Sequence, residues 1–431
     1  MLRCNNYATD FWRWAVVAGR VRAVMTSAAF PTVAAILIFI ATYLVVALGK
    51  LPGLHLDRAG AALLGGALMV AVGVLTPEEA YKAVDVDTIV LLLGMMIVVA
   101  YLRLSGFFRL AQGWVARGAD RPLTLLAGIV VMSAFLSAFL VNDTICLVMT
   151  PFVADLALRL KRDPVPYLLA VAMASNVGSV ATITGNPQNM IIGTVSGLSY
   201  GGFAAALTPV AVVGAALTIL LIAAVYRREF LTAERLALAP EPKRYHRPLV
   251  TKALIVLGAM VALFFAGLPI AKVAITGGAL LLVTRRVKPD KVYREIDWPL
   301  LVMFCGLFIT VAGLEKVLVT PELVDRVAAL QLDRPGILSL VTAVLSNVVS
   351  NVPAVLVMKP FVAATADPGR AWTVVAMAST LAGNFTLLGS VANLIVAERA
   401  KAFGVEVRFM PYFVVGAPLT ILTILFGIWW L

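Results

Sequence analysis

The sequence is poor in charge and nearly devoid of the side chains that hold metals or drive hydrolysis. Only 13% of its 431 residues are charged, and it has three cysteines and two histidines. Cys4, Cys146 and Cys305 are scattered and form no Cys-x-x-Cys pair, which argues against a zinc site or a disulfide framework. The sequence contains neither a His-Glu-x-x-His motif nor a Walker-type phosphate loop. These absences argue against metal-dependent catalysis and against work driven by ATP hydrolysis on this chain.

What the chain has in abundance is apolar surface. Hydrophobic residues make up 61% of it, and the mean hydropathy is +0.97. A soluble protein must cover its outside with polar groups, so lipid must be the solvent for much of this surface. The net charge of +12 is then best explained by Lys and Arg in cytoplasmic loops, because no soluble domain is present to bind nucleic acid.

Long apolar runs predict the membrane spans, since a spanning helix needs about 20 such residues. One stretch, residues 164–226, lacks any Asp, Glu, Lys, Arg or His and is too long for one helix. Inside it, Gly178, Gly185 and Pro187 predict a broken helix, whose freed backbone groups must be satisfied by protein, water or ligand. The predicted full spans are 31–49, 59–75, 88–104, 206–226, 250–267, 270–284, 298–314 and 411–430.

Polar motifs recur in the same order in the two halves of the chain. The segment 142–151, with Asn142 near its start and Pro151 at its end, returns 209 residues later as 351–360. Ser175, Gly185 and Asn189 have counterparts 204 residues later, at Ser379, Gly389 and Asn393.

Each half therefore predicts three spans, a re-entrant hairpin, a broken helix and a final span. The hairpins are 122–160 with its tip at Asn142, and 336–365 with its tip at Asn351. A hairpin returns to its own side, so each half crosses an odd number of times and the second half is inverted. The expected fold class is an all-α polytopic membrane protein with two inverted repeats, about ten crossings and two hairpins.

The expected division of the chain is a first repeat over 31–226, a linker over 227–249 and a second repeat over 250–431. With this topology most Lys and Arg fall on one face, which makes that face and the linker cytoplasmic in a cell inner membrane. Residues 1–30 contain Arg13, Arg20 and Arg22, which interrupt any signal-peptide core. They are interpreted as an interfacial amphipathic segment or an extension of the chain, and an extra span stays open.

The hairpin tips and broken helices should meet near the bilayer centre and form a neutral cage of amides, hydroxyls and opened backbone. Half-helix N-termini suit an anion, whereas half-helix C-termini and carbonyls suit Na⁺ or a proton carrier. The alternative is that these polar residues only cap and join membrane helices. The first half contributes Asn142, Asp143, Thr144, Ser175, Asn176, Thr184, Gly185, Asn186 and Asn189. The second half contributes Ser350, Asn351, Ser379, Thr380, Asn384, Thr386, Gly389, Ser390 and Asn393.

Two charged residues lie inside the predicted hairpins. Asp143 is costly in a membrane, so it should face protein or water and is the candidate group for coupling transport to H⁺ or a cation. It could instead cap the returning helix. Its counterpart in the second half is Val352. Lys359 stands where the first half has Thr150, and it could attract an anion, pair with an acid or extend to the interface.

At these motifs the chain resembles the ion transporter superfamily over residues 31–431, in the branch of arsenite efflux pumps, the melanosomal P protein and citrate-transporter-like (divalent anion:sodium symporter) permeases. Asn142-Asp143 with Thr150-Pro151 is similar to the arsenite pumps, and residues 185–189 and 383–393 are similar to the P-protein group. The resemblance implies a scaffold and a mobile transport domain, a homodimer, an elevator motion, and coupling to Na⁺ or H⁺. Sodium–dicarboxylate members carry Ser-Asn-Thr at both tips, so the different tips here argue against dicarboxylates and two-sodium coupling.

The sequence therefore predicts a secondary transporter of a small inorganic or organic anion, or of a metalloid oxyanion such as arsenite, with no cofactor beyond the coupling ion. A Na⁺/H⁺ antiporter of the same superfamily is the first alternative. An intramembrane enzyme is a remote one, because it would need a paired nucleophile and base or metal ligands at depth.

Overall fold

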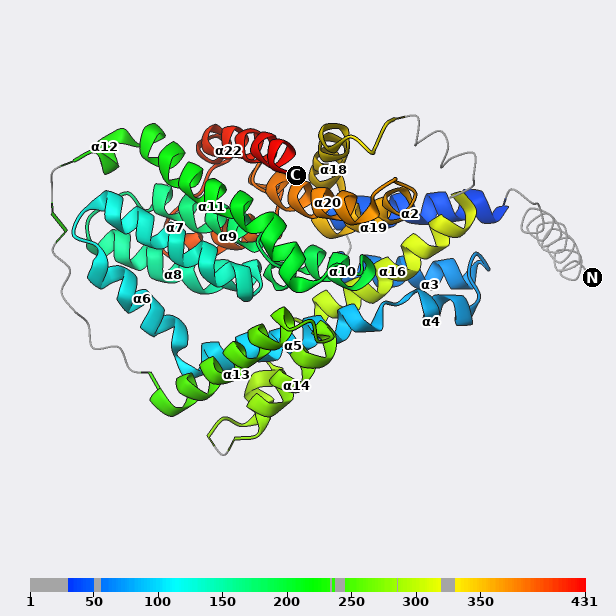
Figure 1. Cartoon of the computed structure of the whole chain (residues 1–431), viewed down its shortest axis with the longest axis horizontal. Helices are drawn as coiled ribbons and strands as arrows, with labels where there is room; N and C mark the ends of the chain where they lie inside the picture. Colours follow the sequence, from blue (N-terminus) through cyan, green and yellow to red (C-terminus); the bar gives the residue numbers. More distant parts are fainter. Residues whose placement is uncertain (1–29, 50–55, 233–234, 237–244, 285, 319–329) are drawn as a thin grey trace, which may run out of the picture. The chain divides into compact units, whose positions relative to one another are not determined.

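The computed structural model describes residues 30–49, 56–232, 235–236, 245–284, 286–318 and 330–431 (Figure 1). The interpretation of residues 1–30 falls almost wholly outside this part of the chain. The chain forms two compact units. One is Met1–Asp85 with Val302–Val324, and the other is Val86–Leu301 with Asp325–Leu431.

Seven helices in the described part of the chain are long and apolar enough to cross a membrane, which confirms an all-α membrane protein. One of them, α7, is the first arm of a predicted hairpin, and the others match predicted spans. They are α2 (Phe30–Leu48), α5 (Val86–Ser105), α7 (Pro122–Phe139), α11 (Tyr200–Val225), α13 (Arg247–Phe265), α16 (Trp298–Leu318) and α22 (Phe409–Trp430).

Two predicted full spans, 59–75 and 270–284, are shorter in the structure. They form α3 (Arg58–Ala71) and α14 (Ile270–Leu282), of 14 and 13 residues. At 1.5 Å per residue each is about 20 Å long, less than the ~30 Å hydrocarbon core. Hydropathy alone overestimated them, because the apolar residues that follow α3 and α14 continue the run without continuing the helix.

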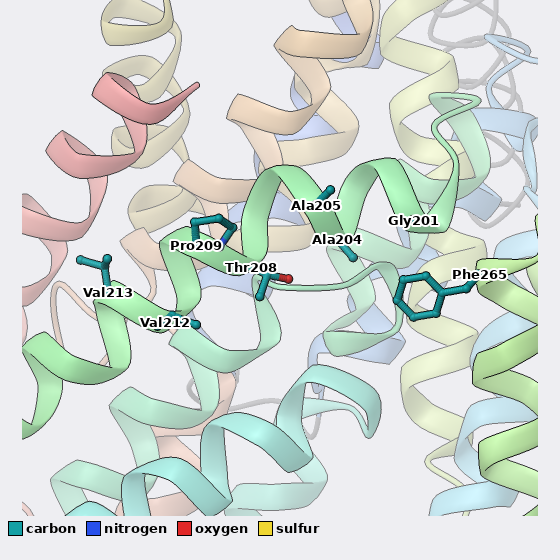
Figure 2. Close-up of a pocket in the computed structure, with 8 residues that line it drawn as sticks. All are labelled: Gly201, Ala204, Ala205, Thr208, Pro209, Val212, Val213 and Phe265. Atoms are coloured by element: carbon teal, nitrogen blue, oxygen red, sulfur yellow. The ribbon is translucent and has the colours of Figure 1, made fainter.

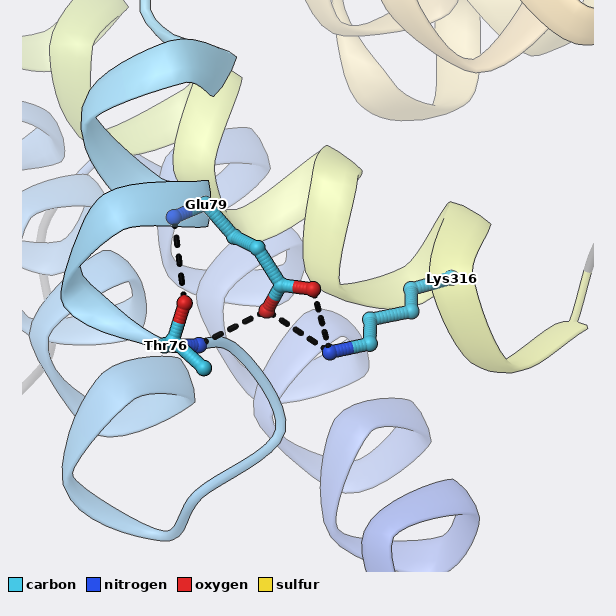
Figure 3. Close-up of polar contacts among 3 residues, drawn as sticks. All are labelled: Thr76, Glu79 and Lys316. Carbon is cyan, nitrogen blue, oxygen red and sulfur yellow. Dashed lines mark hydrogen bonds and ion pairs between the residues drawn. The ribbon is translucent and has the colours of Figure 1, made fainter.

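In the first unit, α2, α3 and part of α16 pack closely around glycines. A Cβ added to Gly306 of α16 would lie 2.3 Å from the backbone of Ala62 in α3, so only glycine allows this contact. A short helix, α4 (Pro77–Ala83), follows α3 and begins with a capping box of Thr76 and Glu79. Glu79 also binds Lys316 near the end of α16, with Nζ 2.8 Å from Oε1 and 2.7 Å from Oε2 (Figure 3).

The second unit contains a set of helices with the same internal pattern. A Cβ on Gly94 of α5 would lie 2.5 Å from the backbone of Ala274 in α14. The short helix α15 (Pro289–Tyr293) follows α14, as α4 follows α3. Arg103 near the end of α5 binds Glu295, just after α15. The first set thus combines α2, α3 and α4 from the first half of the chain with part of α16 from the second half. The other set combines α13, α14 and α15 from the second half with α5 from the first half.

Both predicted hairpins are present in the second unit. The first consists of α7 and α8 (Asn142–Arg159), and the second of α18 (Pro335–Val349) and α19 (Asn351–Ala363). In each, the predicted tip asparagine is the first residue of the returning helix. An amphipathic helix that the sequence pattern did not predict, α6 (Phe107–Gly118), precedes the first hairpin and packs against α7 and α8.

Both broken helices are also present. The first is α9 (Pro164–Ser179), the 3₁₀ turn η1 (Ile183–Gly185) and α10 (Pro187–Val195), and the second is α20 (Pro368–Ala382) and α21 (Val391–Lys401). α9 lies beside α7, α8 and α11 (Figure 1). A short helix, α12 (Arg227–Phe230), begins the predicted linker. The order of hairpin, broken helix and long span thus occurs twice, whereas the inverted orientation of the second copy in a membrane and the repeat boundaries stay predictions.

Candidate functional site

The side chain of Asn176, at the end of α9, is the centre of a buried amide cluster formed by both halves of the chain. Its Nδ2 donates to Oδ1 of Asn384 (2.9 Å) and to Oδ1 of Asn393 (3.1 Å). Its Oδ1 accepts from Nδ2 of Asn142 (3.0 Å) and from Oγ of Ser390 (3.3 Å). All five side chains are at least 96% buried. One residue therefore joins the first hairpin tip to both broken helices.

Asn189 and Asn393 make the same pair of bonds within their own halves. The side-chain amide of each donates to the backbone carbonyls ten and seven residues before it, at 2.7–3.2 Å. These bonds tie the opened segment between the two half-helices to the second half-helix, where the regular helical hydrogen bonds are interrupted. The acceptors are Ser179 and Thr182 in the first copy and Gly383 and Thr386 in the second.

The bonds between the two broken helices are reciprocal. Thr380 follows Asn176 by 204 residues, and its hydroxyl donates to Oδ1 of Asn189 (3.5 Å) as Asn176 donates to Asn393. The same hydroxyl accepts from Nδ2 of Asn186 (3.2 Å). Each broken helix thus donates to the other the same kind of hydrogen bond that it accepts from it. Such reciprocal contacts are typical of an approximate two-fold relation. The two broken helices therefore pack as equivalent partners.

Small residues and caps shape the start of each second half-helix. Asn186 caps α10 by accepting from the backbone N–H of Asn189 (2.8 Å), and Ser390 caps α21 by accepting from Ala392 (3.3 Å). A Cβ on Gly185 would lie 2.1 Å from the carbonyl oxygen of Ser179. The starts of α10 and α21 thus present capped N–H groups, and the glycine lets the backbone of the break pass close to a carbonyl of α9. All of these groups are polar but uncharged.

The two hairpin tips differ in how their asparagines are satisfied. In the second, Oδ1 of Asn351 accepts from Oγ of Ser346 (2.6 Å). In the first, Oδ1 of Asn142 is buried and accepts no hydrogen bond from any described group. The buried hydroxyl of Ser137, the counterpart of Ser346, also has no described partner. A buried amide oxygen without a donor is costly, so the first tip offers an unused acceptor at the edge of the cluster.

The charged candidates lie at the margins of this cluster. Asp143 is half-buried in the first turn of α8, next to Asn142, and Thr144 is also half-buried. Lys359 is exposed on α19, and no described hydrogen bond or ion pair links it to the amides. Its counterpart Thr150 is buried and donates to the carbonyl of Cys146 (2.6 Å). The side chains that meet at Asn176 are therefore neutral.

The remaining predicted residues surround these contacts. Ser350 is half-buried at the second tip, with φ 78° and ψ 160°, and Thr386 contributes its carbonyl rather than its hydroxyl. Other buried members pair within their own half: Ser175 with Sγ of Cys146 (2.9 Å), Thr184 with the hydroxyl of Tyr200 (2.8 Å), and Ser379 with the carbonyl of Ala376 (3.3 Å). Gly389 is buried beside the carbonyl of Gly383.

Several residues of the cluster escaped the sequence analysis. The hydroxyl of Tyr412 on α22 donates to Oδ1 of Asn384 (3.4 Å), and Nε2 of Gln188 donates to Thr380 (3.1 Å). Ser346, Tyr200 and Ser179, whose hydroxyl accepts from Nδ2 of Asn186 (3.0 Å), were missed as well. Gln188 lies inside the predicted break and could have been chosen. Tyr200 and Tyr412 open long apolar helices, where nothing in the sequence separates a tyrosine that binds the cluster from one that faces lipid.

A separate apolar groove lies away from these amides, between α11 and α13. Small residues such as Gly201 and Ala204 form its floor on α11, and the ring of Phe265 from α13 borders it (Figure 2). Apart from Thr208, its lining carries no polar side chain. It therefore has none of the features expected of a site for a polar substrate.

Comparisons with known proteins agree with this architecture. Residues 36–382 match the sequence pattern of the citrate transporter family. The silicon efflux transporter LSI3 of Oryza sativa subsp. japonica is 29% identical over 88% of this chain and 93% of its own. A 46 kDa membrane protein of Mycobacterium leprae is 30% identical (91% and 96%), and the putative transporter arsB of Dictyostelium discoideum is 25% identical (87% of each).

Among solved structures, the YdaH transporter of Alcanivorax borkumensis has the same fold, with a TM-score of 0.58, 15% identity, and coverage of 92% of this chain and 96% of its own. The paired hairpins, the broken helices and a sequence match over most of the length lead to one conclusion. The chain is a multi-pass membrane transporter and belongs to the citrate transporter family.

Proposed function

We propose that this protein is a secondary active transporter that moves a small oxyacid or its anion, such as arsenite or silicate, across the inner membrane, coupled to H⁺ or Na⁺. The single observation that supports this is the cluster around Asn176, where one hairpin tip and both broken helices share hydrogen bonds. Such a cluster can open from either side only if its members move relative to other helices, which is what alternating access requires.

The neutrality of the cluster favours a substrate that carries little charge when bound. A buried anion without a cation partner is strongly penalised, and Lys359, the one candidate cation, is exposed. An undissociated oxyacid such as arsenious or silicic acid has several hydroxyls, which both donate and accept. Amide and hydroxyl side chains match both roles. The names of the rice and Dictyostelium relatives, which refer to silicon efflux and to arsB, fit this substrate class.

Asp143 is the proposed coupling group. It lies in the first turn of α8 beside Asn142, half-buried, so its carboxyl can exchange with water in one state and face the cluster in another. Proton transfer through this carboxyl would link substrate release to the pH gradient. The unused Oδ1 of Asn142 favours a second candidate, Na⁺/H⁺ exchange, since a cation would be held there by oxygen atoms.

The remaining features of the proposal have two sources. The sequence pattern supports inverted repeats, a cytoplasmic linker over 227–249 and no cofactor other than the coupling ion. The family resemblance supports an elevator motion of the hairpins and broken helices, and a homodimer. The shared bonds among α8, α9, α20 and α21 support the view that these elements move together.

Transport by purified protein in liposomes tests the proposal. Uptake of arsenite, silicate, phosphate, citrate and radioactive sodium is measured under imposed pH and Na⁺ gradients. We expect uptake of a hydroxylated oxyacid that follows a gradient and is lost in Asn176→Ala. Gradient-driven sodium flux with no oxyacid uptake would favour the antiporter, and uptake that ignores both gradients would contradict secondary transport.

A further inference from the structure

A second groove lies along one face of α13, near the N-terminal end of the helix. Arg247, Pro248, Thr251, Lys252, Ile255 and Val256 line it. The first two turns of the helix supply the basic and hydroxyl groups, and the third turn supplies the aliphatic ones. The groove thus has a cationic head and an apolar floor along one face of a membrane span.

Two cations near the head, Lys252 and Arg286, contact groups other than carboxylates. Nζ of Lys252 donates to the carbonyls of Leu281 (3.3 Å) and Val283 (2.6 Å), at the end of α14. The guanidinium of Arg286, just beyond α14, contacts Nε2 of His246, next to Arg247 (2.6 Å). These contacts fix the positions of the positive charges without neutralising them.

No carboxylate balances these charges within the part of the chain that the structure describes. Arg247, Lys252 and Arg286 make no ion pair there, whereas other cations of the same unit do. Arg103 pairs with Glu295, and Nε of Arg162 lies 3.9 Å from Oε1 of Glu229. The groove therefore keeps a local excess of positive charge that an anion from outside the protein can complement.

The apolar floor indicates which kind of anion fits. Ile255 is 65% exposed, and α13 buries only 28% of its most apolar window, so lipid chains contact this face. A soluble phosphate would use the cations and leave the floor empty. A glycerophospholipid matches both, because its phosphate meets the cations at the interface while an acyl chain follows Ile255 and Val256. Basic pockets at the ends of membrane helices bind anionic lipid headgroups in this way.

We propose that the head of α13 and the end of α14 form a binding site for an anionic glycerophospholipid, with Arg247 and Arg286 contacting the phosphate and Ile255 contacting an acyl chain. The site is separate from the amide cluster and does not depend on the transported substrate.

The test compares lipid binding by the full-length protein and two variants with equal changes in charge. Delipidated protein in a neutral detergent is titrated with phosphatidylglycerol or phosphatidylcholine, and bound lipid is counted by native mass spectrometry alongside thermal unfolding. The test variant is R247Q/R286Q, which leaves the Lys252 bonds to α14 intact. The control is K272Q/R399Q, since Lys272 and Arg399 are exposed on α14 and α21, away from the groove.

We expect phosphatidylglycerol, but not phosphatidylcholine, to bind and to raise the melting temperature of the wild type and the control. Affinity should fall about tenfold or more in R247Q/R286Q, because charge-assisted phosphate contacts are lost. The conservative variant R247K/R286K should keep most of it. Unchanged affinity in R247Q/R286Q, equal binding of phosphatidylcholine, or equal stabilisation by inorganic phosphate alone would overturn the proposal.

Discussion

The two halves of the chain build the same backbone features with different side chains at a few positions. Both have a hairpin that returns at an asparagine and a broken helix whose second asparagine binds two carbonyls of the break. They differ at two pairs of equivalent positions: the first half has Asn176 where the second has Thr380, and Asp143 where the second has Val352. The shared residues hold the break open, so the residues that differ are the better candidates for chemistry that only one half performs.

The hairpin tips repeat this lesson on a smaller scale. In the second half Ser346 satisfies the tip asparagine, whereas in the first half Ser137 does not, although both serines occupy the same position. The acid is also on the first tip alone. The unused hydrogen-bond acceptor and the acid thus both belong to the first hairpin tip, whereas the asparagine of the second tip already accepts a hydrogen bond.

The largest effect is expected from Asn176→Ala. The variant removes four hydrogen bonds and orphans buried amides, and each orphan costs about 1–3 kcal/mol. Liposome uptake should disappear and the melting temperature should fall sharply. Thr380→Ala, at the equivalent position, is the matched control. Its loss of uptake and of melting temperature should be smaller, because removing one hydroxyl leaves fewer buried groups without a partner than removing an amide does. Equal losses in both variants would mean that the two halves contribute alike.

Asp143→Asn should remove gradient-driven uptake while leaving the melting temperature unchanged. The substitution keeps the size of the side chain and its ability to accept hydrogen bonds in the first turn of α8, but the new amide cannot release a proton at neutral pH. Asp155→Asn is the control, since Asp155 forms an exposed pair with Arg159 on the same helix. If Asp143→Asn transports normally under a pH gradient, Asp143 is not the coupling group.

Asn189→Ala and Asn393→Ala should weaken substrate affinity to a similar degree, by about tenfold, which corresponds to ~1.4 kcal/mol. The reason is that each loses the same two bonds to the carbonyls of its own break. Half-saturation concentrations for uptake measure the effect. A strong loss in one variant with none in the other would show that the matching geometry hides unequal roles.

Ser350 has a backbone conformation (φ 78°, ψ 160°) that favours glycine, whereas its counterpart Val141 lies outside this region. Ser350→Gly should therefore raise stability by about 1 kcal/mol, after the greater flexibility of unfolded glycine is subtracted. Ser350→Ala keeps the strain and removes only the hydroxyl. If both variants lose substrate affinity, the hydroxyl contacts the substrate, and if only Ser350→Gly gains stability, the strain is real.

The smallest effect concerns the pair of Glu79 and Lys316 in the first unit (Figure 3). The hydrogen bond from Lys316 lowers the pKa of Glu79. The pair therefore contributes its stability above the ordinary pKa of a glutamate and loses it as the pH falls through the lowered pKa. Glu79→Gln should flatten the acid limb of the melting-temperature profile. The change should be slight, because both side chains are exposed to water. An unchanged acid limb would mean that another group causes it.

Much of the fold could be predicted from local sequence properties. Hydropathy located α5, α11, α13, α16 and α22 to within a few residues, except that α11 begins six residues earlier than predicted. The hairpin tips and breaks followed from Asn, Gly and Pro at matching offsets. The early ends of α3 and α14 were not predicted, because an apolar run does not show where its helix ends. The amphipathic α6 was not predicted, because an interfacial helix has no long apolar run.

The sequence by itself determined that the chain is a membrane protein with two copies of one plan, and which asparagines the plan repeats. These are properties of composition and spacing, and the lipid solvent enforces them on any chain with this pattern. Only the tertiary structure decided that Asn176 joins Asn142, Asn384 and Asn393, that Tyr412 reaches the same group, and that Lys359 is exposed. Such partnerships depend on how helices distant in the chain pack together, and spacing along the chain carries no record of that.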